Sequence, residues 1–389
     1  MKVNLNTPYF IVMFFLFTLL ANIVNQIFNN DILVISIMLF VFILDSLFVK
    51  DPIRLLTILI IAFKGYFLIS TYDPLSSIDA HNYYNMAFSG DNSGTSFFSM
   101  IINLISGDFS IVEMTSLSYQ LVASIFGTHS VLVLVYANYI MIYLSAIMFL
   151  DILKYRGFNF SEFKASLFIL FVVLSPLLSK YSTLLLKEAI LLFLTILSIK
   201  SYVCWKNYFL FILLLLIATV IRPYTAIIIL AYFIYLEIFS FKKSLILVFI
   251  SFLAMCAYFY NAGISIIGYL KDIALSFAAI IAAPNFLRLD SWLLTPFLVL
   301  ESLLTFTFIC YSFYTYGIKG NKYLIVSIVL MSIILGAISY NRGSKIEQLS
   351  SIKSGSLLQD DIVRKKFGYQ LLLLSLIIVG NKKRETDDY

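Results

Sequence analysis

The feature that most constrains this chain is a series of apolar runs separated by short polar connections. Each run is about 17–22 residues long, which matches a helix crossing the ~30 Å hydrocarbon core of a bilayer. The runs lack the ~10-residue alternation of an outer-membrane barrel. Only 12% of the 389 residues are charged, whereas a soluble domain carries about a quarter. We therefore predict an all-α, multi-pass membrane protein.

The chain is predicted to form a single membrane domain over residues 1–389, with about twelve transmembrane helices and further helices at the outer face. Placing both termini on the cytoplasmic side gives every short inner connection at least two basic residues, as the positive-inside rule expects. The longer outer segments are then about 73–129, 261–291 and 341–366. The predicted spans are 9–28, 32–49, 55–72, 130–150, 164–179, 183–203, 207–221, 223–241, 244–260, 292–316, 322–340 and 367–380.

One apolar stretch, 264–283, is interrupted by Lys271 and Asp272. We interpret it as a re-entrant or interfacial segment, because a span here would place the basic C-terminal tail outside. No metal or cofactor is predicted, since the three cysteines and two histidines lack metal-binding spacing. The sequence also lacks a nucleotide-binding loop.

The first outer segment, STYDPLSSIDAHNYYNMAFSG at 70–90, offers a candidate base. Asp79 at the outer mouth of a membrane bundle could take a proton from a sugar hydroxyl. Tyr83, four residues later, shares a helix face with Asp79, and His81 lies between them. Tyr83 and His81 are candidates for substrate binding. The alternative is a polar loop in which Asp79 caps the following helix.

A second candidate region is SPLLSKYSTLLLKEAI at 175–190, in which Pro176 marks the end of a span. Lys180 and Lys187 are seven residues apart and would share a face of one helix. Ionisable residues at such depths usually face the bundle interior and mark a substrate path, which favours Lys187 and Glu188 as site residues and Lys180 as a further substrate-binding candidate. The alternative is that the lysines extend to the membrane interface.

The third candidate is Arg222 in IRPYTA at 221–226, a short outer turn at the depth of Lys187. Its planar guanidinium suits phosphate oxygens. Two cations and a carboxylate at one level indicate a site for an anion. Arg288 and Arg342 in the later outer segments are further candidates for substrate binding, or are simply solvated.

Lys64 and Glu301 are further charged residues inside predicted spans. Lys64 lies in the middle of the third span and requires a partner or a water path. Glu301 lies within the span that follows Arg288, Asp290 and Trp292. We interpret this region as a local ion pair with an aromatic interfacial anchor.

These residues resemble those of bacterial polysaccharide polymerases of the Wzy type, including the EpsG-like group, which build O-antigen, capsule or exopolysaccharide. They also resemble, more distantly, the multi-pass glycosyltransferases of the GT-C class. The resemblance rests on Asp79-Ala80-His81-Asn82-Tyr83-Tyr84 after an early span, Lys187-Glu188 opening a middle span, and Arg222-Pro223 at the outer end of a later one.

The resemblance implies transfer of a glycan from a polyprenyl diphosphate donor at the outer face of the cytoplasmic membrane. It also implies Arg222 as a ligand of the lipid diphosphate and Asp79 as the catalytic base. From the residues themselves, Lys187 is expected to bind the diphosphate with Arg222, and Glu188 is the other candidate base. The expected partners are the polyprenyl-linked glycan, membrane lipid and a polysaccharide chain-length regulator, and no nucleic acid. The alternatives are a GT-C enzyme that uses a polyprenyl phosphate sugar, and a lipid-linked oligosaccharide flippase.

Overall fold

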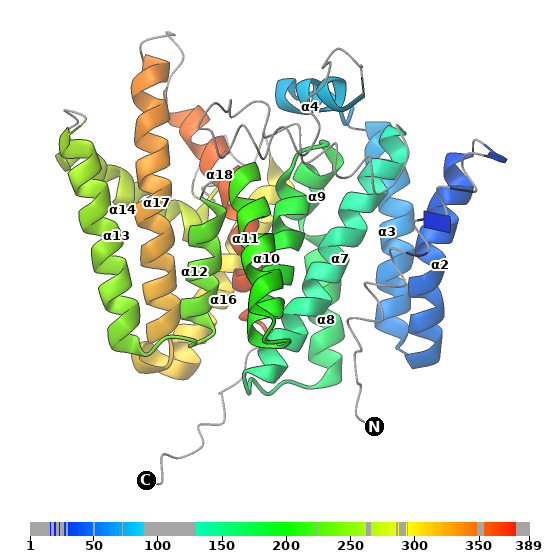
Figure 1. Ribbon diagram of the computed structural model, residues 1–389, viewed down its shortest axis with the longest axis horizontal. Coiled ribbons are helices and arrows are strands. Elements are labelled where there is room, and N and C mark those ends of the chain that lie inside the picture. Colours follow the sequence, from blue (N-terminus) through cyan, green and yellow to red (C-terminus); the bar gives the residue numbers. More distant parts are fainter. Residues whose placement is uncertain are drawn as a thin grey trace. The chain divides into compact units, whose positions relative to one another are not determined.

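A computed structural model of the chain describes residues 30–49, 51–71, 73–88, 130–222, 224–261, 266–284, 295–347 and 354–378, with a few single residues elsewhere (Figure 1). Every regular element in these ranges is a helix. The predicted all-α class is therefore confirmed for the part of the chain that the structure describes. The predicted span 9–28 falls largely outside it, and each later predicted span overlaps a helix.

Four of the described helices are both long and apolar enough to cross a membrane: α3 (Pro52–Thr71), α7 (Val131–Tyr155), α13 (Phe241–Asn261) and α16 (Pro296–Gly320). A fifth span results if α8 (Glu162–Leu174) and α9 (Pro176–Thr183), which bend by 48° at their junction, count as one. The other apolar helices are shorter, as in α11 (Tyr208–Ile221) and α12 (Thr225–Tyr235). These helices indicate a membrane protein, while the described helices do not establish twelve spans.

The helices fall into two compact units. The first unit, Met1–Ile152 with Ser161–Pro223, holds α3, α7, α8, α9 and α11, together with α2 (Asp31–Val49), α4 (Ile78–Phe88) and α10 (Glu188–Val203). The second unit, Leu153–Phe160 with Tyr224–Tyr389, holds α12, α13 and α16, together with α14 (Ile266–Ala282), α17 (Lys322–Glu347) and α18 (Ser354–Ser375).

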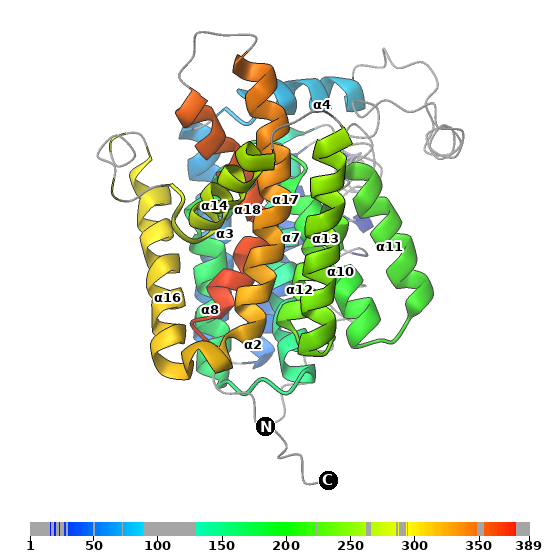
Figure 2. The same cartoon turned by 90° about the vertical axis from the view of Figure 1, so that its left-hand side faces the viewer.

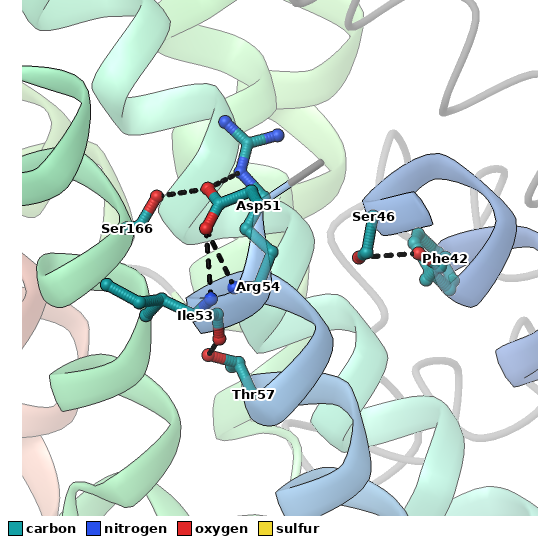
Figure 3. A network of polar contacts seen from close by, with 7 residues as sticks. All are labelled: Phe42, Ser46, Asp51, Ile53, Arg54, Thr57 and Ser166. Atoms are coloured by element: carbon teal, nitrogen blue, oxygen red, sulfur yellow. Dashed lines mark hydrogen bonds and ion pairs between the residues drawn. The ribbon is translucent and has the colours of Figure 1, made fainter. Parts of the chain in front are cut away.

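A buried polar network fixes the start of α3 in the first unit (Figure 3). Asp51 Oδ1 accepts hydrogen bonds from the backbone N–H groups of Ile53 (3.0 Å) and Arg54 (3.2 Å), which would otherwise be unsatisfied at a helix N-terminus. Asp51 Oδ2 lies 3.2 Å from Arg54 Nε and accepts from the Ser166 hydroxyl of α8. One carboxylate thus caps α3, neutralises a buried arginine and joins two helices.

In the second unit, α14 lies obliquely against α17 (Figure 2). Tyr269 is fully buried and donates to the Ile333 carbonyl at 3.0 Å. Gly336 permits the close crossing, because a Cβ there would lie 2.9 Å from the backbone nitrogen of Ile273. Within the stretch 264–283, predicted to be re-entrant or interfacial, residues Ile266–Ala282 form a helix that packs closely on α17.

We expect Gly336→Ala to destabilise the chain by about 1–3 kcal/mol, because the added methyl group must push two backbones apart. Thermal unfolding in lipid nanodiscs measures the effect. Gly368→Ala is the matched control: its Cβ would meet only the flexible end of Ile228, at 2.8 Å from Cδ1. Equal unfolding temperatures for the Gly336 variant and the wild type would show that the crossing is not tight.

Candidate functional site

The first unit brings together the ends of α10 and α11 through a buried ion pair. Arg222 Nη1 donates to Glu188 Oε1 at 2.7 Å, and the two side chains are 14% and 2% exposed. Glu188 is the first residue of α10, where the helix dipole favours a negative charge. Arg222 follows α11 in an extended conformation, φ −155° and ψ 107°, as expected before Pro223. The carboxylate and guanidinium therefore meet between two helix ends.

Lys187 lies beside this pair and contacts the same end of α11. Its side chain is only 5% exposed, and Nζ donates to the Ile221 carbonyl at 3.3 Å. That carbonyl is one of those left without a helical partner at the end of α11. Lys187 is thus buried within the protein, with its ammonium group on a backbone carbonyl.

Lys180 is separated from this cluster by a break in the helix. α9 ends at Thr183 and α10 begins at Glu188, so the prediction that Lys180 and Lys187 share a helix face is wrong. Lys180 Nζ instead lies 5.4 Å from the centre of the Tyr181 ring. Pro176 provides an earlier break, because it lacks an N–H and starts α9 after Ser175 has ended α8. Lys187 therefore lies at the end of the second of two interruptions, directly before α10.

Lys64, whose partner the sequence did not identify, lies at the α8–α9 break. Its ammonium group donates to the Val173 carbonyl and to the Ser179 hydroxyl. It also lies 5.5 Å from the centre of the Tyr139 ring. Breaks in membrane helices are tolerated where other groups satisfy the freed backbone, and Lys64 does so here.

Helix α7 supplies further polar contacts to α9. Asn138 Nδ2 donates to the Ser182 carbonyl at 3.0 Å, and the Tyr139 hydroxyl is hydrogen-bonded to that of Thr183. The Tyr136 hydroxyl donates to the Ala62 carbonyl of α3. Sequence reasoning missed these residues, although Asn138 in the middle of a long apolar run was a signal. The network holds α9, and with it the segment that leads to Lys187.

The candidate base and its neighbours lie on a separate short helix, α4. Figures 1 and 2 show α4 lying crosswise at the end of the first unit where α3 ends. Ser77 Oγ accepts from the Ala80 N–H at 3.2 Å, so Ser77 rather than Asp79 makes this cap. Asp79 is half-buried, while His81 is exposed and lies 2.9 Å from Asn85 through its Nε2.

The structure thus joins Lys187, Glu188 and Arg222 and places Asp79 and His81 on α4. Tyr83 belongs to α4 and Arg342 to α17, but their side chains lie outside the described residues, as does all of Arg288. Glu301 Oε1 accepts a hydrogen bond from Gln370 of α18, and its predicted neighbours Arg288, Asp290 and Trp292 lie outside the described residues.

No protein-family model, curated protein or solved structure matches the chain. Its function is therefore inferred from the chemistry of its own residues.

We expect Lys64→Met to destabilise the chain by about 1–3 kcal/mol, because it leaves a buried carbonyl and a hydroxyl without their donor. The unfolding temperature in nanodiscs should fall. Lys164→Met on α8 removes an exposed lysine and should change it little. If the two variants unfold at the same temperature, Lys64 does not secure the helix break.

Proposed function

We propose that this chain polymerises lipid-linked oligosaccharide repeat units at the outer face of the bacterial cytoplasmic membrane, with both termini in the cytoplasm. One observation carries the proposal: the buried Lys187 and Glu188 and the largely buried Arg222 lie together at two helix ends. Buried charged groups in membrane proteins usually belong to a substrate or ion path. An arginine fork with a nearby ammonium group favours a phosphate or diphosphate ligand.

In this reaction the hydroxyl oxygen of the acceptor sugar forms a bond to the anomeric carbon of the donor glycan. The bond between that carbon and the diphosphate oxygen breaks, and the polyprenyl diphosphate leaves with the electron pair. Arg222 and Lys187 stabilise the negative charge that develops on this leaving group. The acceptor hydroxyl loses its proton to a carboxylate.

The contacts of the two candidate carboxylates favour different roles for them. Glu188 accepts a charge-assisted hydrogen bond from Arg222, which fixes the guanidinium and engages the carboxylate in an ion pair. We therefore assign Glu188 to positioning Arg222. Asp79, on a half-buried face of α4, is the better candidate for the base.

A second candidate, a lipid-linked oligosaccharide flippase, is favoured by the bent pair α8–α9. Transporters often bind substrate at broken membrane helices. A GT-C enzyme would use the same residues, but would add single sugars from a polyprenyl phosphate.

Deleting the gene and analysing the glycan lipids of the cell separates these functions. Loss of a polymerase leaves the lipid core carrying one repeat unit at the outer face. Loss of a flippase leaves the unit on the inner leaflet, and loss of a GT-C enzyme leaves a unit that lacks one sugar. Either of the last two results would overturn the proposal.

A further inference from the structure

A second buried polar cluster lies between α16 and α18 in the second unit. Glu301 and Thr305 are four residues apart on α16, and Lys366 and Gln370 are four apart on α18, so each pair lies on one helix face. All four side chains are at most 7% exposed. Burying polar groups between apolar helices is unfavourable unless they are hydrogen-bonded or have a ligand.

The contacts within the cluster are specific. Gln370 Nε2 donates to Glu301 Oε1 at 2.8 Å and to Thr305 Oγ1 at 3.3 Å. Glu301 is also the charged group that acts electrostatically on Lys366. Because the Glu301 carboxylate requires a donor, these contacts fix which end of the Gln370 amide carries the nitrogen.

The remaining atom of that amide indicates a ligand. Gln370 Oε1 is buried, and it has no hydrogen-bond partner among the residues that the structure describes. Leaving a buried acceptor unsatisfied costs about 1–3 kcal/mol. Since Glu301 and Lys366 carry opposite charges, the ligand that suits this acceptor is a neutral hydrogen-bond donor. A sugar hydroxyl has this chemistry.

We propose that the α16–α18 cluster is a saccharide-binding site in which Gln370 Oε1 accepts a hydrogen bond from a sugar hydroxyl, with the Glu301 carboxylate beside it. The choice of a sugar rests on the proposed function, because that function gives the chain a glycan to hold. The cluster is distinct in sequence and in unit from Lys187, Glu188 and Arg222.

Saturation-transfer NMR tests this site with free monosaccharides: glucose, galactose, rhamnose and N-acetylglucosamine. The full chain is held in nanodiscs free of sugar detergents. We expect at least one sugar to receive saturation from the wild type, and Gln370→Met to weaken its binding at least tenfold. Gln370→Asn should weaken binding equally, because it keeps the amide but shortens the side chain and so moves the amide oxygen away from the sugar. Thr307→Val is the control, since Thr307 is exposed on α16 and bonds only within its helix among the described contacts.

The absence of binding by all four sugars would overturn the inference and leave an ordered water as the partner of Gln370. Binding that is unchanged in both Gln370 variants would also overturn it. Because the measurement needs no turnover, it is independent of the transfer reaction. Sugar binding that depends on Gln370, in a chain that transfers no glycan, would refute the proposed polymerase alone. If the chain transfers glycan but its sugar binding is unchanged in the Gln370 variants, this site alone would be refuted.

Discussion

Arg222→Lys is expected to lower the rate of repeat-unit transfer by about 100-fold while the chain still folds and inserts. Lysine keeps a positive charge opposite Glu188, so the buried carboxylate remains neutralised. It loses the planar fork that can bind two phosphate oxygens at once, and removing one preorganised donor from a developing anion typically costs about 100- to 1,000-fold in rate. Gel analysis of glycan chain length in complemented deletion cells, with quantified membrane insertion, measures the effect.

Two controls separate the chemistry of Arg222 from its structural role. Arg156→Lys replaces an arginine that donates to the backbone carbonyls of Leu236 (2.9 Å) and Glu237 (2.7 Å), and it should leave chain length unchanged. The double variant Glu188→Gln with Arg222→Gln replaces the ion pair by two neutral amides and should insert without polymerising. Wild-type glycan in the double variant would show that the pair serves the fold alone.

Asp79→Asn is the second change with a large expected effect: transfer should fall about 100- to 10,000-fold, the usual contribution of a general base. Folding should be retained, because asparagine matches aspartate in size and Ser77 makes the described cap. Initial rates of glycan transfer by the purified variant measure the loss.

His81→Gln serves as the comparison for Asp79, because His81 is exposed on the same helix and its described contact is with Asn85. We expect it to retain most of the activity. If Asp79→Asn transfers glycan at the wild-type rate, Asp79 is not the base and that role passes to another carboxylate.

The helical class and much of the α10–α11 cluster could be predicted from the sequence. Apolar runs of membrane-spanning length dictate helices, because a bilayer leaves backbone groups no other partners. Lys187 and Arg222 were expected at one depth because they lie at the outer ends of two consecutive predicted spans, 183–203 and 207–221, which a short inner connection joins. The structure adds that Glu188 pairs with Arg222 and that Lys187 contacts the carbonyl of Ile221.

Long-range partners could not be predicted in the same way. Lys64 and Ser179 are 115 residues apart, and Glu301 and Gln370 are 69 apart, so only packing brings them together. From the sequence, Glu301 was grouped with the nearby Arg288 and Asp290, which lie outside the described residues. The helical face predicted for Lys180 and Lys187 failed for a related reason: apolar character continues through residues 184–186, but the helix does not.

The most direct test of the central claim is a transfer assay with the purified chain in nanodiscs and a synthetic polyprenyl diphosphate carrying one oligosaccharide repeat unit. Mass spectrometry of the products should show glycans that grow by whole repeat units, with one polyprenyl diphosphate released for each addition. Growth by single sugars, or unchanged substrate in a chain that is correctly folded, would contradict the account.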